Sequence, residues 1–125
     1  MKTSFNNYEP SFGMALHIPN KKQVEKKLGG YLAEQLEIAT PALERLAKDV
    51  DIFVKQVNDN NIDYRGFNIK VKKIEENPLK NLFGNFSYMS TNVSLYEEKR
   101  YLKSISEMLV GRTKSTVEDF KKYSK

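Results

Sequence analysis

The clearest alternation of apolar and polar residues predicts a β-hairpin in the middle of the chain. Val50–Val57 (VDIFVKQV) is rich in β-branched and aromatic residues, and the turn formers Asn58–Asn61 follow it. In Tyr64–Ile74 (YRGFNIKVKKI), apolar residues alternate with asparagine and lysine. Alternate strand residues point to opposite faces, so we expect one packed face and one solvated, lysine-bearing face. The residues expected on the packed face are Phe67, Ile69 and Val71.

A shorter apolar run near the N-terminus predicts another strand. Ser11–Ile18 (SFGMALHI) ends at Pro19, and both its length and this proline favour a strand over a helix. We expect it to pair with one edge of the hairpin, and the sequence leaves open which edge. The alternating residues that point to one side are Phe12, Met14 and Leu16.

Two helices are expected between this strand and the hairpin. Asn20, with Gln23 three residues later, predicts a helix start because the asparagine side chain can accept from a free amide. The dipeptide Gly29-Gly30 costs about 1 kcal/mol per glycine relative to alanine, so the helix should bend or split there. Thr40 and Pro41 predict the start of a second helix. The first apolar stripe comprises Val24, Leu28, Tyr31 or Leu32, and Gln35 or Leu36.

The C-terminal third predicts a long helix and a short one. Ser94 with Glu97 forms a capping-box pattern, and apolar residues then recur at helical spacing over Leu95–Leu109. Gly111 is the expected end of this helix. A last short helix is expected at a second capping-box pattern, Ser115 with Glu118.

The predicted order is strand, helix, helix, strand, strand, helix, helix. The simplest way to bury these apolar faces is a two-layer α+β sandwich, with a small antiparallel sheet of about three strands covered by helices. A length of 125 residues fits a single domain over 1–125, with 1–10 loosely held.

The charge is unevenly distributed along the chain. Lys plus Arg total 21 against 16 Asp plus Glu, and residues 61–125 carry the whole excess, with 13 basic and 8 acidic residues. A basic half can attract nucleic acid or an acidic partner. Of the 21 basic residues, however, 17 are lysine, whereas phosphate and base recognition favour arginine. Abundant lysine and asparagine are also what an AT-rich genome encodes.

The composition argues against several chemistries. The chain has no cysteine and one histidine, His17, so we expect no disulfide, thiol nucleophile or multi-histidine metal site. Asp49 and Asp51 are only a fragment of a cation site, and no glycine-rich phosphate loop is present. We therefore expect no cofactor and no enzyme. An enzyme would require carboxylate, tyrosine and lysine groups to converge in one pocket.

Membrane and export signals are also missing from the sequence pattern. No apolar run approaches the roughly 18 residues that suggest a membrane span, and the N-terminus lacks the apolar core of a signal peptide. We expect a cytoplasmic protein without membrane contact.

An aromatic segment without helical or strand period supports the leading functional hypothesis. Leu82–Met89 (LFGNFSYM) either fills an open side of the core or presents apolar surface to a partner. We expect a small, non-enzymatic protein-interaction protein, of bacterial or mobile-element origin, whose partner and oligomeric state the sequence does not identify. The candidate contact residues are Phe83, Phe86, Tyr88 and Met89.

The alternative hypothesis is nucleic-acid binding. Lysines on the hairpin and on the following helix could neutralise phosphates. The competing interpretation is an ordinary solvated strand face. The candidate residues are Arg65, Lys70, Lys72, Lys73, Lys99, Arg100 and Lys103.

Overall fold

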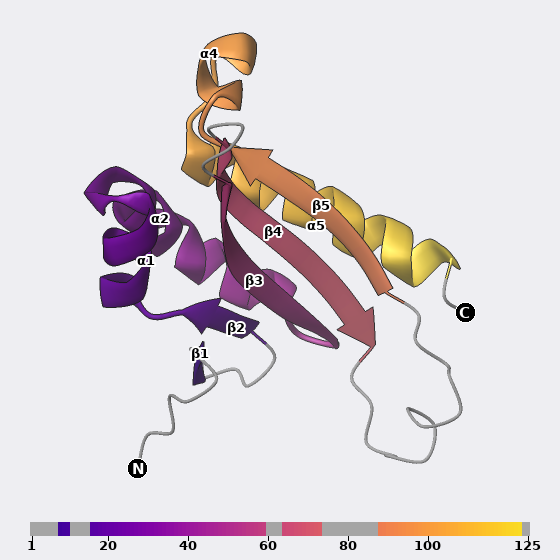
Figure 1. The fold of residues 1–125 in the computed structure, drawn as a ribbon. Coiled ribbons are helices and arrows are strands. Elements are labelled where there is room, and N and C mark those ends of the chain that lie inside the picture. Colours follow the sequence, from indigo (N-terminus) through magenta and orange to yellow (C-terminus); the bar gives the residue numbers. More distant parts are fainter. Residues whose placement is uncertain (1–7, 11–15, 60–63, 74–87, 124–125) are drawn as a thin grey trace.

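Helices cover one side of a mixed β-sheet in the computed structural model, which describes residues 8–10, 16–59, 64–73 and 88–123 (Figure 1). The predicted α+β class is confirmed. The sheet is larger than expected, since the described residues form four strands of four or more residues and a three-residue strand at one edge. The strands, in their order across the sheet, are β1 (Tyr8–Pro10), β2 (Leu16–Pro19), β3 (Val50–Asp59), β4 (Tyr64–Lys73) and β5 (Tyr88–Ser94).

The expected all-antiparallel pairing is wrong for one pair of strands. The hairpin of β3 and β4 is antiparallel as predicted, and Phe53 lies opposite Lys70. Strand β2, however, runs parallel to β3, with His17 opposite Phe53. The connection between β2 and β3 contains two helices, and such a long crossover allows neighbouring strands to run in the same direction. Of the predicted strand at 11–18, residues 11–15 lie outside the described residues.

Strand β5 was not predicted. It pairs antiparallel with β4 along Gly66–Lys72. Its sequence YMSTNVS has polar residues on both faces, so no period of two is visible in it. Gly66 allows β5 to cross closely, because a Cβ atom there would collide with the carbonyl oxygen of Val93.

The first two helices are separated as the glycine pair predicted. Helix α1 (Lys21–Leu28) begins after Asn20, whose side-chain oxygen accepts from the Gln23 amide at 2.9 Å. Gly29 ends it with a φ of 101°, a conformation that favours glycine. Helix α2 (Gly30–Leu46) follows directly.

The predicted helix start at Thr40 and Pro41 is wrong, because α2 continues through both residues. Thr40 Oγ1 donates to the Leu36 carbonyl at 2.7 Å and so lies within the helix. An interior proline costs about 3 kcal/mol. Burying one leucine side chain contributes about 1.5–3 kcal/mol, and Leu36 and Leu43 are both buried around this proline. Packing therefore outweighs the local signal.

The C-terminal helices also differ from prediction. The expected helix over 95–109 is broken, because α4 (Glu97–Tyr101) ends at Leu102, whose φ is 55°. Helix α5 (Ile105–Tyr123) then runs without a break through the expected end at Gly111.

The start of α5 is set by an overlooked capping box. The Ser104 amide donates to Glu107 Oε1, and the Glu107 amide donates to Ser104 Oγ, each at 3.2 Å. The capping box that the sequence predicted at Ser115 and Glu118 lies inside α5 and begins no helix. The pattern alone cannot say which Ser-x-x-Glu sequence begins a helix.

The core lies between the sheet and the layer of α1, α2 and α5. Figure 1 shows α2 and α5 behind the sheet, and the buried apolar residues form one cluster on this side. The predicted packed face of the hairpin is confirmed, because Phe67, Ile69 and Val71 are completely buried. No described helix covers the opposite face, which we call the open face.

Candidate functional site

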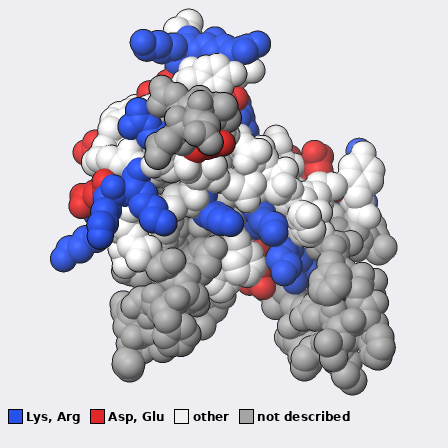
Figure 2. Space-filling model, viewed as in Figure 1, with Lys and Arg blue, Asp and Glu red and all other residues white. Residues whose placement is uncertain are grey.

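The open face gathers aromatic, basic and amide side chains from four strands. The two-residue period turns the apolar residues of β3 and β4 toward the helices and the intervening residues toward the open face. Figure 2, viewed from this side, shows Lys and Arg side chains across the middle of the face. The residues with this orientation include His17 of β2, Asp51, Phe53 and Lys55 of β3, Asn68, Lys70 and Lys72 of β4, and Tyr88, Ser90 and Asn92 of β5.

Phe53 is held at the centre of this group. Its ring stacks on the His17 imidazole, with 4.3 Å between the centroids and 7° between the planes. The Lys72 ammonium lies 5.7 Å from the Phe53 centroid on the neighbouring strand. His17 Nε2 also lies 3.6 Å from Asp51 Oδ1. The Phe53 ring is therefore oriented by β2 and β4 and remains partly exposed.

Tyr88 provides a second ring on β5. Its side chain is 52% exposed, and the Lys70 ammonium lies 4.6 Å from its ring centroid. This distance permits a cation–π interaction. Strand β4 lies between β3 and β5, so its lysines reach both rings. Lys72 lies beside Phe53, and Lys70 lies beside Tyr88.

The amide part of the face is preorganised across β4 and β5. Asn68 Nδ2 donates to Asn92 Oδ1 at 3.0 Å, so the two amides lie side by side. A hollow of about 250 Å³ lies next to them and is lined by Phe53, Lys55, Asn68, Lys70 and Lys72.

Rings, ammonium groups and amides on one open sheet are the groups that bind unpaired bases and a phosphate backbone. A base can stack on an exposed ring, and lysine can neutralise the adjacent phosphate. Amide groups can hydrogen-bond to base edges. Among the described residues of the face, three lysines stand against two aspartates of β3, Asp51 and Asp59. Asp59 lies at the hairpin end of the strand.

The structure does not bring the predicted nucleic-acid residues together on one surface. Lys70 and Lys72 are on the open face, whereas Arg65 and Lys73 have the opposite phase on β4. Arg65 joins Lys99 and Arg100 in a groove of about 690 Å³ beside α4, which Leu95, Tyr96 and Glu98 complete. Lys103 instead lines a cleft against α5.

The predicted protein-contact residues do not lie on one face. Phe83 and Phe86 are outside the described residues. Tyr88 is exposed on the open face, whereas Met89 lies on the other side of β5 and packs partly against the core. Phe53, Lys55 and Asn92 were not among the predicted site residues. The alternation of residues in β3 indicated that Phe53 faces away from the core. Its contacts with His17 and Lys72 depend on strand pairing, which the sequence does not show.

Helix α4 forms a protruding tip at the top of Figure 1. Tyr96, Tyr101 and Leu102 are 61%, 48% and 89% exposed. Glu98 ties the tip to the helices, since its Oε2 accepts from the Ile105 amide at 2.9 Å and from the Tyr31 hydroxyl. The hydrogen bond to Glu98 raises the pKa of Tyr31 to about 12.

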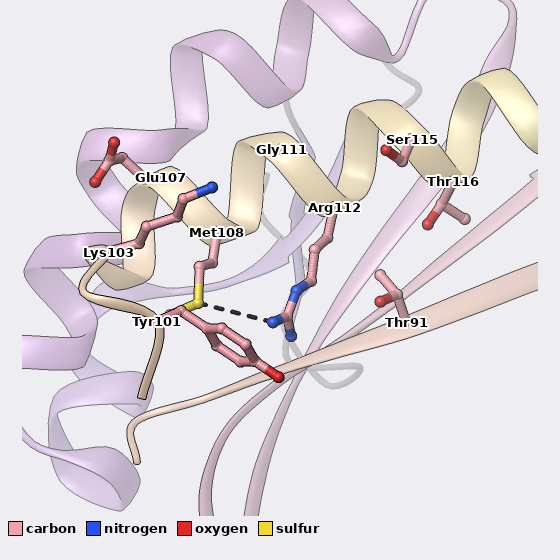
Figure 3. Close-up of a pocket in the computed structure, with 9 residues that line it drawn as sticks. All are labelled: Thr91, Tyr101, Lys103, Glu107, Met108, Gly111, Arg112, Ser115 and Thr116. Carbon is pink, nitrogen blue, oxygen red and sulfur yellow. Dashed lines mark hydrogen bonds between the residues drawn. The ribbon is translucent and has the colours of Figure 1, made fainter. Parts of the chain in front are cut away.

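A cleft of about 470 Å³ separates α5 from β5 and the end of α4 (Figure 3). Arg112 crosses it, and its Nη1 donates to Glu97 Oε1 at 2.9 Å and to the Asn92 carbonyl. Burial alone would raise the pKa of Glu97, but hydrogen bonds from Arg112 and Ser94 outweigh it and hold that pKa below its usual value. The cleft is lined by Thr91, Tyr101, Lys103, Glu107, Met108, Gly111, Arg112, Ser115 and Thr116.

Within the described residues, no group of three His, Cys, Asp or Glu side chains is placed to hold a metal ion. None of the helices in this part of the chain combines the length and apolar character that a membrane span requires. Comparisons with protein-family models, curated proteins and solved structures find no significant match.

Proposed function

We propose that this protein binds single-stranded nucleic acid on the open face of its sheet. The observation that carries the proposal is the half-buried ring of Phe53 and the exposed ring of Tyr88, each with a lysine ammonium over it. Stacking rings with adjacent cations are the common feature of surfaces that bind unpaired bases.

The two rings can take separate bases of one strand. Phe53 is on β3 and Tyr88 is on β5, with β4 between them. Neighbouring strands lie about 4.8 Å apart, so the rings are separated by roughly 10 Å across the sheet. Lys70 and Lys72 lie between them on β4, where they can reach the phosphates that connect the two bases.

A single strand fits this face better than a duplex. Base pairs in a duplex stack on one another, so a ring face is useful only where a base is unpaired. Lysine contributes charge without the two-pronged base recognition of arginine. We therefore expect affinity with little sequence preference, apart from any contribution of the paired Asn68 and Asn92 amides.

The test is fluorescence polarisation with labelled oligouridylate and oligothymidylate of about 12 nucleotides, a length within the site sizes of single-strand binders. The affected variant replaces Lys55, Lys70 and Lys72 with glutamine. For single strands, each lost phosphate contact should reduce the salt slope of log K by about 0.7, so the triple variant should lose about 2.

A matched triple variant controls for net charge. Lys22, Lys26 and Lys114 are exposed on α1 and α5, away from the open face. Replacing these three with glutamine should leave the salt slope close to that of the unaltered protein. Equal loss in both triple variants, or no binding at low salt, would contradict the proposal.

Protein binding is a second candidate, and the α4 tip favours it. Leu102 is 89% exposed and lies between the exposed Tyr101 and the basic residue Lys103. Tyrosine, leucine and basic side chains on a protrusion can fit an apolar pocket with an acidic rim. Affinity capture after nuclease treatment, lost when Leu102 is replaced, would support this function over the first.

A further inference from the structure

The cleft against α5 is separate from the open face. Thr91 lines the cleft, whereas its neighbours Ser90 and Asn92 have the opposite phase on β5 and belong to the open face. The edge strand β5 thus forms a wall between two surfaces. The cleft volume of about 470 Å³ falls within the range of roughly 300–1,000 Å³ that small-ligand sites occupy.

Arg112 is fixed so that part of its guanidinium group faces the cleft. Nη1 is held by Glu97 and by the Asn92 carbonyl. Nη2 has the thioether sulfur of Met108 as a weak acceptor at 3.8 Å. Figure 3 shows the guanidinium group between α5 and β5, with the Tyr101 ring beside it. A planar group positioned in this way can donate to an oxyanion without reorganising.

Hydroxyl groups surround the same space. Thr116 and Thr91 approach each other from α5 and β5, and Ser115 lies one residue before Thr116 (Figure 3). Lys103 adds a second cation at the rim. Among the described lining residues, the single carboxylate is that of Glu107, which points away in Figure 3 and accepts from the Ser104 amide.

The helix itself is locally unfavourable along the cleft. Gly111 lies in the middle of a 19-residue helix, where it costs about 1 kcal/mol relative to alanine. No packing contact requires this glycine, because a Cβ atom there would meet nothing within 4 Å. Ser115 and Thr116 are also weaker helix formers than alanine. Local signals that conflict with the fold often mark functional positions.

We propose that this cleft binds the phosphate group of a small phosphorylated ligand about the size of a mononucleotide. Lys103 supplies charge, and Arg112, which is ion-paired with Glu97 through Nη1, supplies the N–H donors of Nη2. The hydroxyls of Thr91, Ser115 and Thr116 supply hydrogen bonds, and Tyr101 supplies an apolar surface for the rest of the ligand. The phosphate can come from a free nucleotide, or from the end of a strand that leaves the open face over β5. This second source rests on the proposed function.

The test uses orthophosphate, adenosine 5′-monophosphate and adenosine as probes, with binding followed by amide chemical shifts. Gly111→Leu places a large side chain in the cleft, and Gly111→Ala, whose methyl group meets nothing within 4 Å, is its matched control. We expect adenosine 5′-monophosphate and orthophosphate to shift the amides of α5 around Gly111, and adenosine to cause no such shift. Gly111→Leu should weaken binding by a factor of roughly 10 or more, equivalent to about 1.4 kcal/mol.

A second variant guards against an effect of the leucine on folding. The pair Ser115→Ala and Thr116→Val removes two hydroxyls while keeping size and helix, and it should weaken phosphate binding. Adenosine binding as tightly as its monophosphate, or monophosphate binding unchanged in both Gly111→Leu and the hydroxyl pair, would overturn the proposal. Absence of any shift at millimolar phosphate and nucleotide would also overturn it.

The source of the phosphate is decided with oligonucleotides. If the cleft takes a strand end, a 5′- or 3′-phosphorylated oligonucleotide should bind more tightly than its unphosphorylated form, and Gly111→Leu should abolish the difference. If it takes a free nucleotide, the monophosphate should bind while the oligonucleotides show no difference. Binding of the monophosphate to the Lys55, Lys70 and Lys72 variant separates the cleft from the open face, because this variant tests the proposed function alone.

Discussion

The imidazole of His17 stacks almost parallel on the ring of Phe53, with 4.3 Å between the centroids. The contact joins two strands that the sequence separates by 36 positions but that lie side by side and parallel in the sheet. One face of Phe53 is thereby occupied, and the stack sets the plane of the ring. A base would meet a ring already oriented by the fold.

Replacing either ring should reduce the affinity for oligonucleotides and should have only a modest effect on the stability of the protein. Removing one stacking ring typically costs about 1–3 kcal/mol of binding per base. We therefore expect Tyr88→Ala to reduce affinity by roughly 5-fold or more, and Phe53→Ala to do the same with a modest loss of stability. Polarisation titrations at fixed salt measure the first effect, and thermal denaturation measures the second.

Tyr123 offers a matched control for this prediction. It is 69% exposed, and the Lys122 ammonium lies 5.5 Å from its ring centroid, so it reproduces the local chemistry of Tyr88. It stands at the end of α5 rather than on the sheet. Tyr123→Ala should leave affinity unchanged, and a loss equal to that of Tyr88→Ala would remove the sheet face from the proposal.

Much of the sheet could be predicted where the signal was local. The alternation around Phe67 indicated which residues of the hairpin are buried, and Gly29 marked the break between two helices. The candidate site could not be predicted in this way. Phe53 meets His17 through a parallel pairing, and Tyr88 reaches the face through a strand whose two sides are both polar. Such contacts depend on register between segments that are distant in the sequence.

The errors in the C-terminal helices have a different cause. Gly111 and Ser115 have the local preferences of a helix end and a helix start. Leu109, Thr113 and Val117 are nonetheless buried at steps of four along α5. The free energy of this burial exceeds the local preference, so the helix continues. The same residues that misled the prediction lie on or beside the cleft.

Replacing Gly111 and Gly66 with alanine should change the stability of the protein in opposite directions. At Gly111 the added methyl group meets open space, so Gly111→Ala should stabilise the protein by about 1 kcal/mol. At Gly66 the methyl group would collide with the Val93 carbonyl, so Gly66→Ala should destabilise the protein and disturb the pairing of β4 with β5. Chemical denaturation of both variants measures the difference. A loss of stability in Gly111→Ala would mean that the glycine is needed for the helix itself.

Replacing Leu102 with glycine should make the folded protein slightly more stable. Its φ of 55° lies in the left-handed region, which costs a non-glycine residue about 1–2 kcal/mol. Its side chain is 89% exposed, so little packing is lost on removal. Leu102→Gly removes this strain, and the greater flexibility of glycine in the unfolded chain cancels part of the gain. We therefore expect a slightly higher melting temperature. A marked fall in melting temperature would show that the exposed leucine supports the tip.

The hydrogen bond to Glu98 should shift the ionisation of Tyr31 to higher pH. The pKa of Tyr31 is raised to about 12, so the neutral phenol is the form that the fold favours. Its contribution to stability is complete below the ordinary tyrosine pKa of about 10 and is lost as the pH rises through 12. Absorbance titration should show a tyrosine component near pH 12 that Tyr31→Phe removes. An unchanged titration curve in this variant would contradict the assignment.

Glu97 should make the stability of the protein depend on acidic pH. Its burial opposes ionisation, but hydrogen bonds from Arg112 and Ser94 lower the pKa of Glu97 below its usual value. A lowered pKa means that the stabilisation is complete above the ordinary glutamate pKa of about 4.3 and is lost as the pH falls through the lower value of the folded state. Glu97→Gln should therefore be less stable than the unaltered protein at neutral pH, and the difference should shrink on acidification. Urea denaturation from neutral to acidic pH measures this convergence, and a difference independent of pH would mean that packing rather than charge holds Glu97 against Arg112.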